Sequence, residues 1–218
     1  MTCFNPREAW LEKNHEINEH LQDGIVINQK LRFSGKGEPT HEIPCKKCTG
    51  CLADASRDWG VRIAHEAQTH QQNSFITLTF DDQHYPKDGK ISVEHTQRFI
   101  KRLRKHLSGH KIKYFITGEY GEQTKRAHYH ACIFGTDFRG GSYPLDHQLY
   151  GNPVLDAIWG KGHVAIGELN TQSALYVAGY VQKKIGDPDT FSRMSKGSIN
   201  GWKNKDGREP PIGYRWAE

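Results

Sequence analysis

The alternation of apolar and polar positions along the chain predicts several regular elements in its first half. Residues 1–44 alternate only weakly and are expected to form short strands and loops. Residues 52–70 indicate an amphipathic helix, because apolar side chains recur there at helical spacing, at Trp59, Ile63 and Ala67. Residues 75–80 alternate apolar side chains with threonine, which is typical of a β-strand.

The second half continues with helical and strand patterns. Ser92 is expected to cap a helix with a buried apolar stripe formed by Val93, Ile100, Leu103 and Leu107. Residues 111–118 and 127–134 predict two strands of a hairpin, joined by the Gly-containing loop 121–126. Two further helices are expected, at residues 154–159 and 173–185. This order of elements indicates an α+β fold with a mainly antiparallel sheet flanked by helices.

Length and composition indicate the size of the fold and the kind of protein. The chain has 218 residues, 35% of them hydrophobic and 25% charged, which is enough for one large globular domain or one and a half. No apolar run is long enough to cross a bilayer and no signal pattern is present, so we expect a soluble, intracellular protein without a membrane partner.

The net charge of +5 is clustered on the helix that follows Ser92. A basic cluster favours a polyanionic partner such as nucleic acid, although an ordinary solvated helix face has the same composition. The candidate DNA-binding residues in this cluster are Lys101, Arg102, Arg104 and Lys105.

The second hairpin strand carries a candidate metal site. His128 and His130 are two residues apart, so both imidazoles lie on one face of the sheet. If the hairpin turns near the middle of its loop, Glu119 falls across from His128 and completes a set of two histidines and one carboxylate. Such a set suits Mn²⁺ or Mg²⁺. Glu122 is the alternative carboxylate, and a plain pair of strand histidines is the alternative without metal.

The last predicted helix carries candidate nucleophiles. Tyr176, Tyr180 and Lys183 fall within one arc of the helix, displaced from its apolar side. A phenol becomes a useful nucleophile when a cation or an activated phosphate assists it, and Lys183 or Lys184 can supply that charge. Lys184 is also a candidate for a DNA contact, whereas a merely solvated tyrosine face is the alternative.

Three cysteines follow one another as Cys45-x-x-Cys48-x-x-Cys51. This spacing is too tight for a secreted disulfide framework and suits a structural Zn²⁺ in a reducing compartment, but a fourth ligand is needed. The alternative is three reduced cysteines without a metal. Further candidate ligands elsewhere in the chain are Cys3, His41 and His65, whereas Cys132 is expected to be a small core residue.

These motifs together resemble a known family. The order Phe75-Ile-Thr-Leu-Thr79, His128-Tyr-His130 and Tyr176 with Tyr180 and Lys183 is similar to the three motifs of HUH replication initiators. The nearer resemblance is to the replication initiation proteins of microviruses, in particular the gokushovirus branch. It is carried by Cys3-Phe-Asn-Pro6, Pro44 to Cys51, Phe99 to Lys105, Gly118-Glu-Tyr-Gly121 and Ser173 to Ala178.

The resemblance implies a ferredoxin-like antiparallel sheet that bears the histidines, with the tyrosine helix beside it. It implies rolling-circle initiation by a metal-dependent endonuclease that nicks a single-stranded DNA origin. Attack by tyrosine gives a 5′-phosphotyrosine and a free 3′-hydroxyl for the host polymerase, and a host helicase is a further expected partner. The implied place of action is the cytoplasm of the infected host cell, and the resemblance favours Cys3 as the fourth zinc ligand.

The resemblance also divides the chain into three parts. Residues 1–51 form an N-terminal segment with the zinc-binding cysteines, residues 52–190 the HUH endonuclease core, and residues 191–218 a tail that continues further in relatives. Relatives often carry a lysine three residues after the first tyrosine, where this chain has Gly179, whereas Tyr180 keeps Lys183 at that spacing. Tyr180 is therefore ranked slightly ahead of Tyr176 as the attacking residue.

Two alternatives share these features. A non-catalytic, zinc-stabilised module would bind single-stranded DNA with structural histidines and tyrosines and would form no covalent adduct. An HUH transposase or relaxase would use the same site on a different DNA partner.

Overall fold

The computed structural model describes residues 3–11, 31–32, 38–39, 41–146, 148–183 and 191–194. Internal contacts divide the chain into a first unit, residues 1–54, and a second unit, residues 55–218. Helix α1 (Thr49–Gln68) contains the boundary between them. Within the described part of the chain, no helix combines the length and the apolar character that a membrane span requires.

The first unit contains a small antiparallel sheet. Its central strand β1 (Arg7–Leu11) pairs with β2 (Leu31–Arg32) on one side and with β3 (His41–Ile43) on the other. In β1 the side chain of Ala9 is fully buried. Short strands were expected in this region, and they occur.

The second unit is built on a seven-stranded antiparallel sheet in the order β10-β5-β6-β4-β9-β8-β7. Three of its strands are long: β4 (Asn73–Thr79), β5 (Lys113–Tyr120) and β6 (Ala127–Phe134). The others are β7 (Tyr143–Pro144), β8 (Tyr150–Gly151), β9 (Val164–Gly167) and β10 (Phe191–Met194). The helices of this unit, besides residues 55–68 of α1, are α2 (Val93–His106), α3 (Pro153–Trp159) and α4 (Thr171–Lys183).

The central strands have a ferredoxin-like topology. Along the chain they follow the order β4-α2-β5-β6-α3-β9, and in the sheet β5, β6, β4 and β9 are neighbours in that order. Each neighbouring pair is antiparallel, so β4 and β5 run parallel to each other across the α2 crossover. The expected fold class, an α+β domain with an antiparallel sheet flanked by helices, is confirmed.

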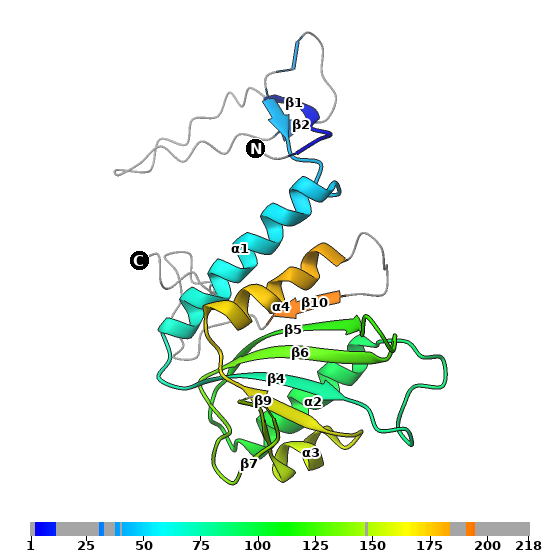
Figure 1. Ribbon diagram of the computed structural model, residues 1–218. Coiled ribbons are helices and arrows are strands. Elements are labelled where there is room, and N and C mark those ends of the chain that lie inside the picture. Colours follow the sequence, from blue (N-terminus) through cyan, green and yellow to red (C-terminus); the bar gives the residue numbers. More distant parts are fainter. Residues whose placement is uncertain are drawn as a thin grey trace. The chain divides into compact units, whose positions relative to one another are not determined.

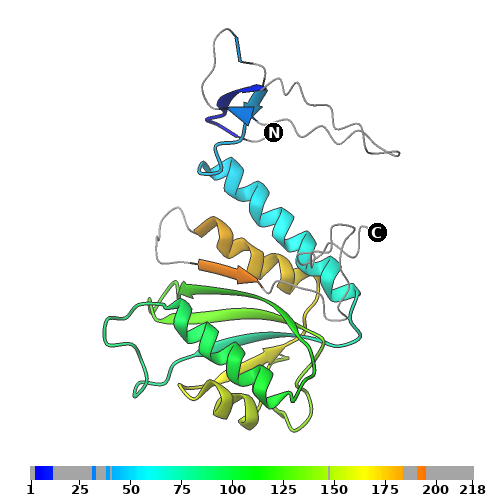
Figure 2. The same ribbon diagram turned by 180° about the vertical axis from the view of Figure 1, so that it is seen from behind.

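The strands bury both of their faces, and the two faces have different helical covers. On β6, Tyr129, Ala131 and Ile133 point into a core shared with α2 and α3. The alternate residues Cys132 and Phe134 pack with Ile63 of α1 and with the apolar side of α4. Figures 1 and 2 show α2 and α3 on one face of the sheet and α4 on the other. A functional group on an even-numbered position of β6 therefore faces α4.

Several predicted elements differ from the structure at their ends. Helix α1 begins at Thr49, so Cys51 lies in its first turn and not before it. The first hairpin strand is shifted to Lys113–Tyr120, whereas the second strand, Ala127–Phe134, and the loop between them are as predicted. Ser92 accepts a hydrogen bond from the Glu94 N–H, which confirms it as a cap.

Strands β9 and β10 were not predicted. Strand β9 has only four residues, of which Val164 and Ile166 are buried. An alternation this short, with glycines on both sides, is not recognisable as a strand pattern in the sequence. Strand β10 lies in a polar stretch that was interpreted as a tail, and its pairing with β5 supplies the regularity that its sequence lacks.

Candidate active site

Glu119, His128 and His130 converge on the sheet face that α4 covers. The hairpin register places Glu119 directly across from His128, as its loop length predicts. Both Nε2 atoms approach the same carboxylate oxygen of Glu119, at 2.8 Å from His128 and 3.1 Å from His130. Their ligand atoms all lie within 4.8 Å of one another, which makes the three residues a possible metal-binding group. Glu122, the alternative carboxylate, is exposed in the turn and is not part of this group.

The far nitrogen of each imidazole is held by a second partner. His130 Nδ1 lies 3.0 Å from the hydroxyl of Thr77 on the neighbouring strand, and His128 Nδ1 lies 3.1 Å from the Arg126 carbonyl oxygen. A carbonyl only accepts, so Nδ1 of His128 is the donor in that contact, and Nε2 of the same ring faces Glu119. Such outer contacts fix the ring orientation of histidines that bind metals. Thr77 was not predicted as a site residue, although its alternating position in the strand 75–80 places it beside His130.

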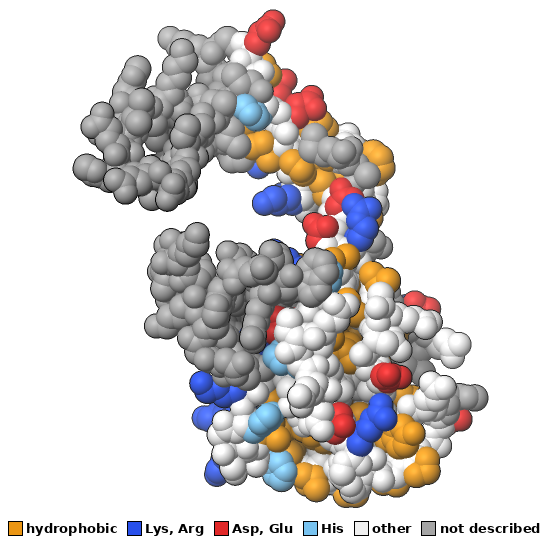
Figure 3. All heavy atoms as spheres, turned by 90° about the vertical axis from the view of Figure 1, so that its left-hand side faces the viewer, with side chains coloured by type: hydrophobic (Ala, Val, Ile, Leu, Met, Phe, Trp, Pro, Cys, Tyr) orange, Lys and Arg blue, Asp and Glu red, His pale blue; other side chains and the backbone are white. Residues whose placement is uncertain are grey.

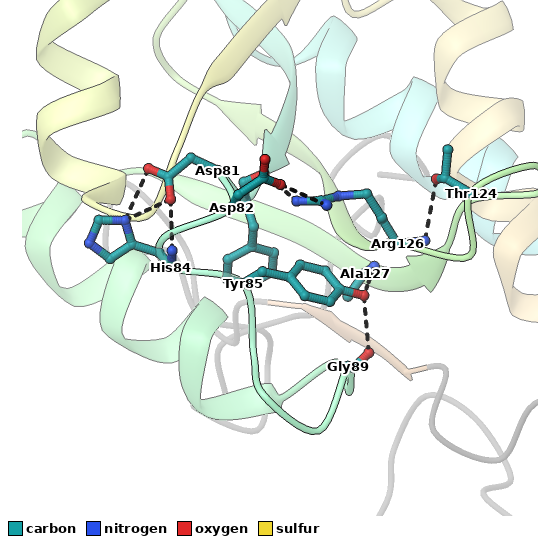
Figure 4. A network of polar contacts seen from close by, with 9 residues as sticks. Asp81, Asp82, His84, Tyr85, Gly89, Thr124, Arg126 and Ala127 are labelled. Carbon is teal, nitrogen blue, oxygen red and sulfur yellow. Dashed lines mark hydrogen bonds and ion pairs between the residues drawn. The ribbon is translucent and has the colours of Figure 1, made fainter.

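The Arg126 carbonyl is itself held in place by a network around the hairpin turn (Figure 4). The Arg126 guanidinium forms an ion pair of 2.9 Å with Asp82 and lies 4.5 Å above the Tyr85 ring. The Tyr85 hydroxyl accepts the N–H of Ala127, at 3.3 Å. These contacts join the segment after β4 to the residues that precede His128. No local pattern could have predicted them, because their partners are about 40 residues apart in the chain.

The donor set fits a divalent cation. Burial raises the pKa of Glu119, but hydrogen bonds from His128 and His130 outweigh it and hold that pKa well below its usual range. The carboxylate is therefore ionised at neutral pH, and two imidazole nitrogens face it. Two histidines and one carboxylate bind divalent metals while leaving coordination positions open. The residues present thus fit the divalent metal that the sequence predicted.

The two tyrosines of α4 lie beside this cluster but differ in exposure. The Tyr180 ring stacks on the His130 ring, with centroids 5.1 Å apart, and its side chain is only 3% exposed. The Tyr176 ring meets the same histidine edge-on at 5.5 Å and is 52% exposed. Both were expected to stand clear of the core, and this is wrong for Tyr180, because its side of the helix packs onto β6.

Environment also separates the two phenols chemically. Burial, together with contacts to Tyr176 and Glu119, raises the pKa of the Tyr180 hydroxyl well above its usual range. Helix α4 ends at Lys183, but the Lys183 side chain and the whole of Lys184 lie outside the described residues. The predicted assistance from these lysines therefore stays a prediction.

The basic cluster of α2 does not share this face. Helix α2 packs on the opposite side of the sheet, where its apolar stripe contacts the core. Arg102 donates to the carbonyl oxygens of Ile158 and Trp159, at 2.6 Å each, and so caps the C-terminus of α3. These two bonds use part of the guanidinium, Arg102 is itself exposed, and its DNA contact stays a prediction. Lys101, Arg104 and Lys105 are exposed.

Acidic and basic side chains of the described residues are interspersed on the molecular face drawn in Figure 3. Any DNA contact made by α2 would be separated from the tyrosines by the thickness of the sheet.

A second group of possible metal ligands lies in the first unit. The sulfur atoms of Cys3, Cys45, Cys48 and Cys51 are all within 4.8 Å of one another. Hydrogen bonds from the backbone of Cys51 and Phe4 lower the pKa of the Cys48 thiol to about 6. The alternative ligands His41 and His65 are not in this group, and Cys132 is buried separately in β6.

Comparison with known proteins gives three relatives among the replication proteins of small phages. The chain is 35% identical to replication-associated protein ORF2 of Spiroplasma virus 4 over 90% of its own length and 68% of that protein. It is 36% identical to replication-associated protein ORF4 of Chlamydia phage 1, over 66% of this chain and 38% of that one. It is 35% identical to replication-associated protein VP4 of Bdellovibrio phage phiMH2K, over 85% of this chain and 59% of that protein.

Among solved structures, the N-terminal nuclease domain of minute virus of mice non-structural protein-1 is similar with a TM-score of 0.27. The identity is 12%, and the match covers 74% of this chain and 76% of that one. A likeness this low bears on neither the site nor its chemistry.

The ferredoxin-like sheet, its histidine and carboxylate cluster and the adjoining tyrosine helix thus agree with the arrangement that the resemblance to replication initiators implied. The family model of replication-associated protein ORF2 matches residues 73–185, a range that runs from β4 to the end of α4 and contains this cluster. The chain belongs to this family, in its microvirus-type branch.

Proposed function

We propose that the chain is an HUH endonuclease that initiates rolling-circle replication by nicking a single-stranded DNA origin. The observation that supports this most is the placement of an exposed phenol, that of Tyr176, against the histidine and carboxylate cluster. A nucleophile and a phosphate-binding site must be adjacent for a displacement at phosphorus, because the reacting atoms have to approach in line.

Glu119, His128 and His130 would hold the metal ion through one carboxylate oxygen and two Nε2 atoms. Bound there, a divalent cation supplies Lewis-acid polarisation of the scissile phosphate and stabilises the departing oxygen. Thr77 and the Arg126 carbonyl keep the two imidazoles turned toward that position. Mn²⁺ and Mg²⁺ both suit this role, and we propose that either supports activity.

Tyr176 is the proposed nucleophile. Its hydroxyl oxygen forms a bond to the phosphorus of the DNA as the bond from phosphorus to the 3′-oxygen breaks. The phenol loses its proton to solvent, and the departing oxygen takes up a proton from solvent to become the 3′-hydroxyl. The product is a 5′-phosphotyrosine, which conserves the bond energy for later strand joining by the reverse attack. The free 3′-hydroxyl primes the host polymerase in the infected cell.

Tyr180 is proposed to orient His130 in this first cleavage. Its ring lies parallel to the imidazole, at an interplanar angle of 4°, and its buried hydroxyl contacts Tyr176 and Glu119, so it is less accessible than the phenol of Tyr176. The spacing to Lys183 had placed Tyr180 ahead of Tyr176, and the difference in exposure is our reason for proposing the opposite order. A second attack by Tyr180, as a two-tyrosine initiator needs for resolution, would require α4 to move.

A nicking assay tests this proposal. The substrates are single-stranded oligonucleotides tiled across the genome that encodes the chain, incubated with Mn²⁺ and resolved on a denaturing protein gel. The wild-type chain should form a covalent adduct, and Tyr176→Phe should abolish it. The matched control is Tyr143→Phe, an exposed tyrosine in the outermost strand β7, which should keep full activity.

Replacing both His128 and His130 by alanine should also abolish the adduct while the chain still binds single strands weakly. Binding by the wild-type chain without any adduct, over the whole tiled set and with Mn²⁺ present, would favour the non-catalytic module. An undiminished amount of adduct in the double histidine variant would show that cleavage does not depend on the proposed metal site.

A further inference from the structure

The four cysteines of the first unit have the spacing of a single metal ion's ligands. Cys45 Sγ lies 3.9 Å from Cys51 Sγ, Cys48 Sγ lies 3.9 Å from Cys3 Sγ, and every pair falls within 4.8 Å. These distances are far too long for disulfide bonds, whose sulfurs are about 2.0 Å apart. From this geometry we propose that the first unit holds a structural Zn²⁺ bound by Cys3, Cys45, Cys48 and Cys51.

The separation of the sulfurs decides between two kinds of metal centre. Zn²⁺ binds thiolates at about 2.3 Å in a tetrahedron, so its four sulfurs stand about 3.8 Å apart. The observed 3.9 Å matches this edge. An iron–sulfur cluster also uses four cysteines, but its iron and sulfide ions lie between the ligands and hold the thiolates farther apart. The geometry therefore favours one ion over a cluster.

Backbone amides around the sulfurs supply the charge balance that thiolates need. Cys45 Sγ accepts the N–H groups of Lys47 and Cys48, at 3.5 and 3.3 Å, across the tight turn between the two cysteines. Lys46 adopts a φ of 61° in that turn, a left-handed conformation that brings both amides to one sulfur. Amide donors directed at sulfur stabilise the negative form of the ligand.

Two further amides come from opposite ends of the unit. Cys48 Sγ accepts the N–H of Phe4 at 3.4 Å, and Cys3 Sγ accepts the N–H of Cys45 at 3.3 Å. Cys3 precedes β1 and Cys45 follows its partner β3, so the proposed ion closes the open end of this strand pair. Cys51, in the first turn of α1, then ties the small sheet to the start of the helix.

The ion would supply stability that the described part of this unit does not obtain from packing. Among the described residues of the first unit, Ala9 and Cys51 are the hydrophobic side chains that are buried. So small a core leaves little hydrophobic free energy, and metal binding at such sites acts as folding free energy. The proposed zinc is thus a folding element of the first unit, separate from the catalytic cluster of the second.

Metal analysis of the full chain tests this inference. The chain is purified under reducing conditions in the His128→Ala/His130→Ala background, which removes metal bound at the histidine cluster. Elemental analysis should find about one zinc per chain. Cys48→Ser should lose it, whereas Cys132→Ala, a change at the buried cysteine of β6, should retain it.

A second measurement keeps the inference testable if a cysteine variant fails to fold. Cobalt replacing zinc in the otherwise unaltered background should give the visible bands of tetrahedral Co²⁺ and the charge-transfer absorption of four thiolates. Absence of both zinc and this cobalt spectrum would overturn the proposal. Iron and acid-labile sulfide in place of zinc would overturn it in favour of a cluster.

Discussion

Thr77 provides a sharp test of how the metal site is organised, because its hydroxyl is the contact that holds the far side of His130. The Oγ1 atom lies 3.0 Å from His130 Nδ1. A hydroxyl donates or accepts, so it satisfies Nδ1 whether the imidazole proton is on Nε2, facing Glu119, or on Nδ1, as a metal on Nε2 requires. Thr77→Val keeps the shape of the side chain and removes both options.

The size of the effect follows from two costs. Loss of an outer partner of a metal-binding histidine lowers metal affinity by about 10- to 100-fold. This corresponds to about 1.4 to 2.7 kcal/mol. Leaving Nδ1 unpaired in a buried site also lowers the free energy of unfolding by about 1–3 kcal/mol. We expect the Mn²⁺ concentration that gives half-maximal adduct formation to rise by the same factor, about 10- to 100-fold, with activity largely restored at saturating metal.

The assay is a Mn²⁺ titration of adduct formation with a fixed oligonucleotide, beside a urea unfolding curve of each variant. Thr79→Val is the matched control, because Thr79 lies two residues along the same strand and donates to the His163 carbonyl, outside the cluster. An unchanged Mn²⁺ midpoint in Thr77→Val, or an equal shift in Thr79→Val, would refute the idea that Thr77 orients His130.

Three further predictions concern pH, a buried ion pair and charge. The carboxylate of Glu119 stays ionised because its pKa is held low, so the pH dependence of metal binding should come from the two imidazoles. As the pH falls from about 8 to about 6, protons compete for the imidazole nitrogens, and the Mn²⁺ concentration at half-maximal adduct formation should rise. A midpoint that does not change with pH would exclude histidine ligands. Lys113→Met removes the ammonium group from the buried carboxylate of Glu66, which keeps His70 at 2.8 Å, so the free energy of unfolding in urea should fall by about 3 kcal/mol, the lower end for a broken buried pair, against little for exposed Lys111→Met. Charge reversal at the exposed basic residues of α2 should weaken binding of single-stranded DNA and reduce its dependence on salt, as measured by fluorescence anisotropy. These residues are Lys101, Arg104 and Lys105. Unchanged binding would show that this face is only solvated.

The sequence predicted the metal cluster because hairpin geometry is local. A loop of known length fixes which residues pair across the strands, and the i, i+2 period then places both imidazoles beside Glu119. The fold class followed from the order of elements for the same reason. The crossover that makes the sheet ferredoxin-like depends on β9, whose four residues carry too little periodicity to be recognised.

The roles of single residues on helices were harder to predict, because a helical wheel gives an angle but not the neighbour at that angle. Tyr176 and Tyr180 share an arc, yet α4 packs so that only Tyr180 is covered by β6. Arg102 belongs to the basic pattern of α2, but the end of α3 supplies two carbonyl oxygens that no local rule places beside it. The location of Cys3 near the cysteine triplet likewise depends on the pairing of β1 with β3.

The central claim is that Tyr176 attacks a phosphodiester beside the histidine and carboxylate cluster. Peptide mass spectrometry of the covalent adduct, formed by the wild-type chain with Mn²⁺ and digested with protease and nuclease, tests it most directly. We expect a nucleotide phosphate on the peptide that contains Tyr176, localised to that side chain by fragmentation. A phosphate on Tyr180 would contradict the assignment of the nucleophile, and an adduct on neither tyrosine would contradict the mechanism itself.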